Sequence, residues 1–420
     1  MLTIYSGKQR NDGGLTRRSV LKIGALSAGG LNLADMLRLE SQGAVEPKTR
    51  HKTVISVYLN GGPPHQDMYD LKPNAPNEYR GEFSPISTNV PGMDICELMP
   101  LQASIGDKLA IIRNFKGGGG HNSDFILTNS RDVTKHPGFG SVVSYVRGGT
   151  RDGIPQYVVL SGRGGGRTAY LGAAHQPFKP SGEVMRNMRL AIPEDRLADR
   201  GSLLKCFDQL NSDIDATGKM AGIDQFTNRA LQMISSSKVR DALDVNQESE
   251  DVREKYGKKN MAWLQARRLA EAGVSFIYLK GPGGWDTHSN NFVTLRRQLP
   301  QVDHLLHTLI TDLHTRGLGD DVAVILWGEF GRTPKVNARA GRDHWPTGFV
   351  MISGGGLKMG QVVGATDAYS AKPTSVPYTP ANVMSTLYHV LGIDPATTIP
   401  DFGGRPRYLL DDQRPITELV

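Results

Sequence analysis

Val274 to His288 has the sequence VSFIYLKGPGGWDTH, and the rest of the chain is organised around this stretch. Its first half is a near-continuous run of β-branched, aromatic and aliphatic residues, which is typical of a strand buried on both faces of a parallel sheet. Glycines and a proline then let the backbone turn sharply, and Asp286 and His288 follow directly. Ligands of open α/β sheets bind beyond the carboxyl ends of the strands, so this pair is placed to share a metal ion or to act as acid and base.

Alone, this D-x-H pattern also fits a turn-capping aspartate beside an exposed histidine. Two further strands, however, end in the same way. Thr53 to Leu59 leads through Gly and Pro residues to Asp67, a candidate metal ligand or general base that also suits a turn. Val322 to Trp327 leads to Glu329 and Arg332. Glu329 is a candidate base or ligand, and the Arg332 guanidinium is suited to hold an oxyanion or a carboxylate.

A glycine run follows the predicted strand Leu109 to Arg113 and opens a helix. The free N–H groups at such a helix start can stabilise an anion. His121 and Ser123 lie there, and Ser123 is the candidate nucleophile. The alternative is that Ser123 only caps the helix.

Composition limits the classes of function. The 420 residues include 38% hydrophobic and 22% charged residues, which fits a soluble globular protein. The formal net charge is +7, and the basic residues are spread out rather than interleaved with aromatics, which disfavours nucleic-acid binding. The two cysteines, Cys96 and Cys206, do not have the spacing of a metal site, and whether they pair is open.

The first 45 residues have the pattern of a targeting segment. Thr16 to Lys22, TRRSVLK, resembles the twin-arginine export motif, and a Gly/Ala-rich segment too short for a membrane span follows it. We therefore expect export through the twin-arginine route to the periplasm or cell surface, with no transmembrane span in the mature protein. The alternative is a basic surface helix.

The remaining chain, 46–420, is predicted to be a single α/β domain. Residues 195–272 are polar with periodic apolar positions, which indicates a helical insertion that covers one face of the sheet. Phe292 to Arg316 is predicted to be the amphipathic helix that connects two parallel strands.

Four motifs in order, NGGPPHQD, GWDTH, EFGRTP and GRDHWP, together with the leader, resemble domain of unknown function family 1501 over residues 50–415. The wider resemblance is to the alkaline-phosphatase-like superfamily of phosphatases and sulfatases. It implies a three-layer α/β/α fold with a largely parallel central sheet. It also implies that Asp286, His288 and His344 hold one divalent metal ion, and Asp67 is our own candidate for a further ligand.

The second metal position of the superfamily reads Asn60 and Glu329-Phe330 here, and phenylalanine cannot ligate. One ion is therefore expected: Zn²⁺, Mn²⁺ or Fe²⁺, with Ca²⁺ as a further candidate. The resemblance implies an exported hydrolase of phosphate or sulfate esters, acting on a small anionic ester or a sulfated glycan. Its catalytic residues would be Ser123, His121, Glu329 and Arg332. The alternative is a non-catalytic periplasmic binding or assembly protein that keeps the fold and at most one metal.

Overall fold

A seven-stranded sheet forms the centre of the computed structural model, which describes residues 51–118, 120–121, 123–128, 130, 136–148, 150–151, 153–162, 167–180 and 237–420. In spatial order its strands are β13 (Gln361–Val363), β4 (Ala110–Lys116), β12 (Thr347–Gly354), β9 (Val322–Trp327), β1 (Thr53–Tyr58), β8 (Phe276–Lys280) and β7 (Tyr157–Val159). Among these described strands β12 alone runs antiparallel to its neighbours. The predicted largely parallel sheet is confirmed.

The reversal of β12 follows from the path of the connection before it, which stays at the carboxyl edge of the sheet. A parallel return would need a crossover, usually a helix, that carries the chain back to the opposite edge. The segment between β9 and β12 instead forms a two-stranded ladder of β10 (Gly331–Arg332) and β11 (His344–Trp345) at the carboxyl edge. The chain therefore re-enters the sheet from that edge.

Each face of the sheet carries its own apolar core. Ile55 and Val57 of β1 belong to one core, whereas Val54 and Tyr58 belong to the other, as the alternation of side chains along a strand requires. The buried run predicted from the sequence thus faces apolar side chains on both sides.

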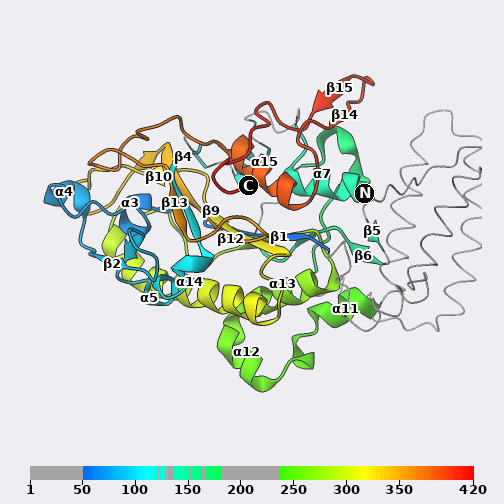
Figure 1. Ribbon diagram of the computed structural model, residues 1–420, viewed down its shortest axis with the longest axis horizontal. Coiled ribbons are helices and arrows are strands. Elements are labelled where there is room, and N and C mark those ends of the chain that lie inside the picture. The colour runs from blue at the N-terminus through cyan, green and yellow to red at the C-terminus, as the bar shows by residue number, and fades with distance from the viewer. Residues whose placement is uncertain are drawn as a thin grey trace, which may run out of the picture. The chain divides into compact units, whose positions relative to one another are not determined.

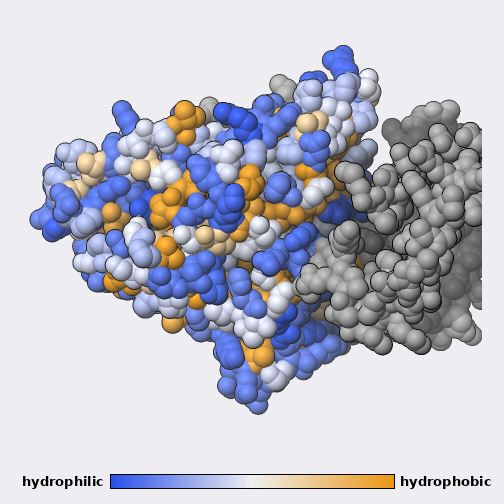
Figure 2. All heavy atoms as spheres, in the orientation of Figure 1, coloured by the Kyte–Doolittle hydropathy of each residue, from blue (hydrophilic) through white to orange (hydrophobic). Residues whose placement is uncertain are grey.

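Helices cover both faces. On the side of Ile55 the core includes residues of α5 (Pro100–Ala103), α13 (Met261–Ala272) and α14 (Asn291–Thr315). On the side of Val54 it includes residues of α6 (Ser123–Thr128), α7 (Phe139–Val146) and α15 (Pro380–Val390). Figure 1 shows α13 and α14 below the sheet and α7 and α15 above it, and Figure 2 shows apolar residues across the middle of this view between hydrophilic areas. This is the predicted α/β/α layering.

Shorter elements complete the described part of the chain. They are α3 (His65–Met68), α4 (Asn77–Arg80), β2 (Pro85–Ser87), β3 (Asp94–Cys96), β5 (Thr150–Arg151), β6 (Ile154–Pro155), α11 (Ser237–Leu243), α12 (Glu250–Tyr256), β14 (Thr398–Pro400), β15 (Pro406–Tyr408) and the 3₁₀ turns η1 (Gly106–Lys108), η2 (Ala169–Leu171), η3 (Ala173–His175), η4 (Val245–Gln247) and η5 (Lys258–Asn260).

Two sequence predictions fall on residues outside this description. The predicted leader is outside the described residues, and so are residues 195–236 of the predicted helical insertion. The later part of that insertion is described and contains helices α11, α12 and α13. Within the described residues, no helix combines the length and the apolar character that crossing a membrane requires.

Candidate metal centre

The carboxyl edge of the sheet gathers the polar loops, because three parallel strands end there at the same level. Tyr58 at the end of β1 is in register with Lys280 of β8 and with Trp327 of β9. The loops that follow these strands carry Asp286 and Glu329, so side chains far apart in sequence become neighbours. This placement is the one expected for ligand sites in open α/β sheets.

Asp286, His288 and His344 form the centre of the cluster. Oδ1 of Asp286 lies 3.1 Å from Nε2 of His288 and 3.3 Å from Nε2 of His344, and the two nitrogens are 3.2 Å apart. Ligand atoms bound at 2.0–2.1 Å around a tetrahedral zinc ion are about 3.3 Å from one another. The three atoms therefore have the spacing of one face of a tetrahedral metal site.

His121 extends this cluster. Its Nε2 atom lies 3.3 Å from Oδ2 of Asp286. One ligand atom each from His121, Asp286 and His344 lie within 4.8 Å of one another, a spacing that can hold a metal ion. The sequence pointed to His121 as a catalytic side chain, and its position also makes it a candidate ligand.

Arg332 holds Asp286 in place rather than facing open space. Its side chain is fully buried, and Nη2 lies 2.6 Å from Oδ1 of Asp286. Nε donates to the carbonyl of Gly62 and Nη1 to the carbonyl of Arg342. Although partial burial opposes ionisation, the Arg332 and His344 hydrogen bonds lower the pKa of Asp286 to about 2. The Asp286 carboxylate is therefore charged at neutral pH, as a metal ligand must be.

His288 is oriented from behind by a second carboxylate. Its Nδ1 atom is 2.6 Å from Oδ1 of Asp343, while Nε2 faces the cluster. Asn337 donates to the other oxygen of Asp343 and to the carbonyl of His288. A carboxylate on the far nitrogen fixes the tautomer of a metal-bound histidine and raises its basicity. The sequence indicated Asp343 only as the neighbour of His344, so its orienting contact was missed.

Glu329 is a buried carboxylate with one oxygen available. It is 1% exposed; Oε1 accepts from the backbone N–H of Gly61 and lies 3.3 Å from Nδ1 of His121. No described residue forms a hydrogen bond with its Oε2. Burial and the nearby Glu329 charge raise the pKa of the Tyr58 hydroxyl, which keeps that hydroxyl protonated. Glu329 is therefore placed to bind a cation or accept a proton beside His121.

Phe330 forms an apolar wall of the cluster. It is 1% exposed, and its ring centroid lies 4.3 Å from that of His344 and 5.2 Å from that of His121.

Burial lowers the pKa of His344, and the charge of Arg332 adds to this effect. The imidazole is thus neutral at neutral pH, which is the form that binds metals.

Asp67 lies outside this cluster. Its oxygens accept from Nε and Nη2 of Arg342, at 2.9 and 2.8 Å, and Asn291 donates to Oδ2. Asp67 and Arg342 are both almost completely buried. A carboxylate saturated by a bidentate arginine has little capacity left for an ion, so we assign Asp67 to the structure of the loop rather than to the metal centre.

Ser123 is the first residue of α6, as the glycine run predicted. The position of its side chain lies outside the described part of the structure. The preceding glycines approach the cluster: the N–H of Gly118 donates to the carbonyl of Glu329 at 2.7 Å. A Cβ on Gly117 would lie 2.4 Å from the same carbonyl oxygen, which explains the need for glycine there.

Comparisons with known proteins identify the family but not a reaction. The similar solved structures include a sulfatase, PsFucS1, from Pseudoalteromonas sp., with 11% identity, 85% of this chain and 70% of that chain covered, and a TM-score of 0.38. They also include the phosphonate monoester hydrolase SpPMH from Silicibacter pomeroyi, with 10% identity, 83% and 74% covered, and a TM-score of 0.37. No curated protein matches the sequence. The model of the family "Protein of unknown function (DUF1501)" matches residues 51–420, and the chain therefore belongs to that family.

Proposed function

We propose that this chain is an exported, metal-dependent hydrolase of phosphate or sulfate esters. The observation that carries the proposal is the triangle of Asp286 Oδ1, His288 Nε2 and His344 Nε2, with edges of 3.1–3.3 Å. Two histidines and one carboxylate are a common ligand set of catalytic zinc, which leaves one position open.

The chain's own residues have distinct roles in this proposal. Asp286, His288 and His344 hold the ion, and His121 is a further ligand or acts in proton transfer. Glu329, with an oxygen that forms no hydrogen bond with any described residue, is the general base. A divalent cation held there would lower the pKa of water and stabilise negative charge on the ester. Ser123 stays the candidate nucleophile, with water as the alternative.

A second candidate function is a non-catalytic binding or assembly protein that keeps this fold. Two observations favour it. Phe330 packs against His121 and His344, at the position where the superfamily has a ligand of a second metal ion. The Arg332 guanidinium is already bonded to Asp286 and backbone carbonyls, so it is not available to an anionic substrate.

Metal analysis of the purified protein, combined with hydrolysis assays, distinguishes the two candidates. We expect about one divalent ion per chain, as a single set of three ligands implies. We also expect turnover of 4-nitrophenyl phosphate or 4-nitrophenyl sulfate that a Glu329→Gln variant loses. Bound metal without turnover of either ester would favour the binding protein, and metal-free protein would contradict the site itself.

A further inference from the structure

A cavity lies beside the hairpin of β14 and β15, and it shares no residue with the candidate metal centre. Its volume is about 600 Å³, in the range of small-molecule sites. The hairpin supplies most of the lining, and Tyr170 of η2 and His136 complete it; the remaining lining residues are Asp401, Phe402, Gly403, Arg405, Pro406, Arg407, Tyr408 and Asp411.

Asp401 gives the hairpin a defined shape. Its Oδ1 accepts from the backbone N–H groups of Gly403 and Arg405, at 2.9 and 3.1 Å, which closes the turn. Its Oδ2 lies 3.0 Å from Nε of Arg407. Ile399 is buried in the apolar core and anchors the hairpin to the sheet's helical layer. The side chains at the turn are therefore presented from a fixed support.

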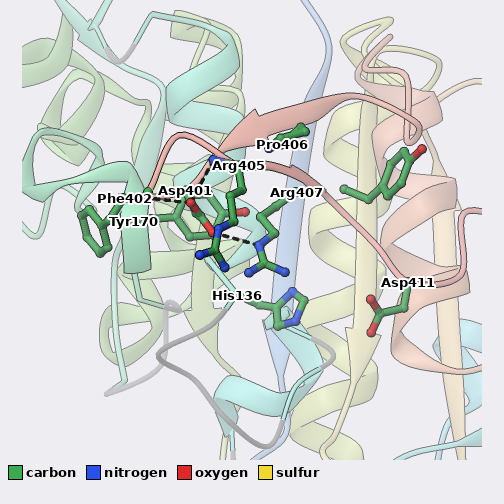
Figure 3. A pocket seen from close by; sticks show the side chains of 10 residues that line it. His136, Tyr170, Asp401, Phe402, Arg405, Pro406, Arg407 and Asp411 are labelled. Carbon is green, nitrogen blue, oxygen red and sulfur yellow. Dashed lines mark hydrogen bonds and ion pairs between the residues drawn. The ribbon is translucent and has the colours of Figure 1, made fainter.

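Positive charge is concentrated at one end of the cavity. Figure 3 shows the guanidinium groups of Arg405 and Arg407 side by side, with the His136 ring next to them and Asp411 at a distance. Arg407 is paired with Asp401, whereas Arg405 has no ion pair among the described residues. An unpaired guanidinium fork matches the geometry of a sulfate or a carboxylate.

Aromatic side chains surround this charged end. Phe402 is 84% exposed and Tyr408 is 59% exposed, although both are large apolar residues on a short hairpin. The Tyr170 hydroxyl is buried and has no hydrogen-bond partner among the described residues. Because Phe402 and Tyr408 line the cavity and are exposed, their rings are accessible to a ligand there. Flat rings pack against the C–H faces of sugars, and carboxylate, guanidinium and phenol groups bond their hydroxyls.

From this combination we propose that the cavity binds an acidic carbohydrate. The arginine pair receives a sulfate or carboxylate substituent, and Phe402 and Tyr408 stack on the sugar rings. The positive charge of the arginines recognises the acidic substituent, and the aromatic rings recognise the sugar that carries it. This site is separate from the metal centre and does not depend on the proposed reaction.

Binding by the full chain to dextran sulfate and to oligogalacturonate tests the proposal. We expect affinity for at least one of the two and none for unsubstituted dextran of equal length. Arg405→Ala and Phe402→Ala should each weaken binding about tenfold, the loss of one charge-assisted contact or one stacked ring. The control is Arg297→Ala, an exposed arginine on α14, which should leave binding unchanged.

Three outcomes would overturn the proposal. The first is no affinity for either acidic probe. The second is an equal loss of affinity in Arg297→Ala and Arg405→Ala, which would mean that the overall positive charge alone explains the binding. The third is competition by millimolar inorganic sulfate with no effect of Phe402→Ala, which would leave an anion site without sugar recognition. Thermal melting of each variant verifies that these exposed substitutions leave the fold intact.

Discussion

His344 is the residue on which the proposed metal centre depends most, since its Nε2 atom is close to both His288 and Asp286. It lies on the short strand β11, and the pairing of Arg332 with His344 in the β10–β11 ladder sets its position. One two-residue ladder thus positions both the residue that holds Asp286 and the histidine that faces it.

We expect His344→Ala to lose most of the bound metal and to melt at a lower temperature, because metal binding is linked to folding. His307→Ala on α14 is the control, since His307 lies outside the cluster and should keep its metal content. Mass-spectrometric metal analysis measures the metal content, and thermal denaturation measures the melting temperature. A variant that retains one ion per chain would show that His344 is not a ligand.

Asp343 acts through His288, so its replacement separates orientation from ligation. Asp343→Asn keeps the shape but loses the carboxylate that accepts from Nδ1, and metal affinity should fall by about 10-fold to 100-fold. Competition with a chelator measures the affinity. Asp251→Asn, an exposed carboxylate in α12, serves as the control. Equal affinities in both variants would mean that the 2.6 Å contact does not support the ligand.

At the scale of elements, the Asp67–Arg342 pair joins α3 to the loop that precedes β11. Neither side chain reaches solvent, and Arg342 also donates to the carbonyl of Tyr79 near the end of α4. The pair therefore connects three segments around the metal centre without contributing a ligand to it. Its contribution should appear in stability rather than in metal binding.

Asp67→Asn should destabilise the protein by about 3–5 kcal/mol, because it leaves the buried Arg342 charge without its partner. Urea denaturation measures the change. The control is Glu82→Gln, which removes an exposed pair with Arg296 and should cost less than about 1 kcal/mol. If Asp67→Asn instead lost metal at unchanged stability, Asp67 would have to be returned to the ligand set.

At the scale of the whole molecule, we propose that residues 1–45 direct export. The residues 1–45 carry the export pattern, whereas the family match begins at residue 51. Twin-arginine substrates are exported folded, which suits a site assembled from loops that are distant in sequence. Replacing Arg17 and Arg18 together by lysine should therefore leave a folded precursor in the cytoplasm with its leader intact.

Cell fractionation and the mass of the protein test that prediction. Lys22→Arg keeps the positive charge of the motif and is the matched control, which should be processed as the parent is. Normal processing of the double variant would rule out the twin-arginine route.

Local sequence patterns were enough to predict the strands and the edge of the sheet on which the polar residues gather. Buried strands are encoded locally: Val322 to Trp327 is apolar throughout and forms β9 with those bounds. Asp286 and His288 were candidates because they follow such a strand, and His344 was a candidate because the family resemblance includes a late histidine. The family was equally visible, since its motifs are short and contiguous.

Which polar side chains form hydrogen bonds and ion pairs with one another became clear from the folded chain alone. Asp67 and Asp286 look alike in sequence, each a carboxylate after a strand and a glycine turn. In the folded chain a buried arginine saturates Asp67, whereas Asp286 has one arginine on one side and three histidines around it. Partners that are distant in sequence, 275 residues away for Asp67 and 46 for the arginine beside Asp286, determine this difference. Such pairings depend on sheet order and loop path, which no local pattern encodes.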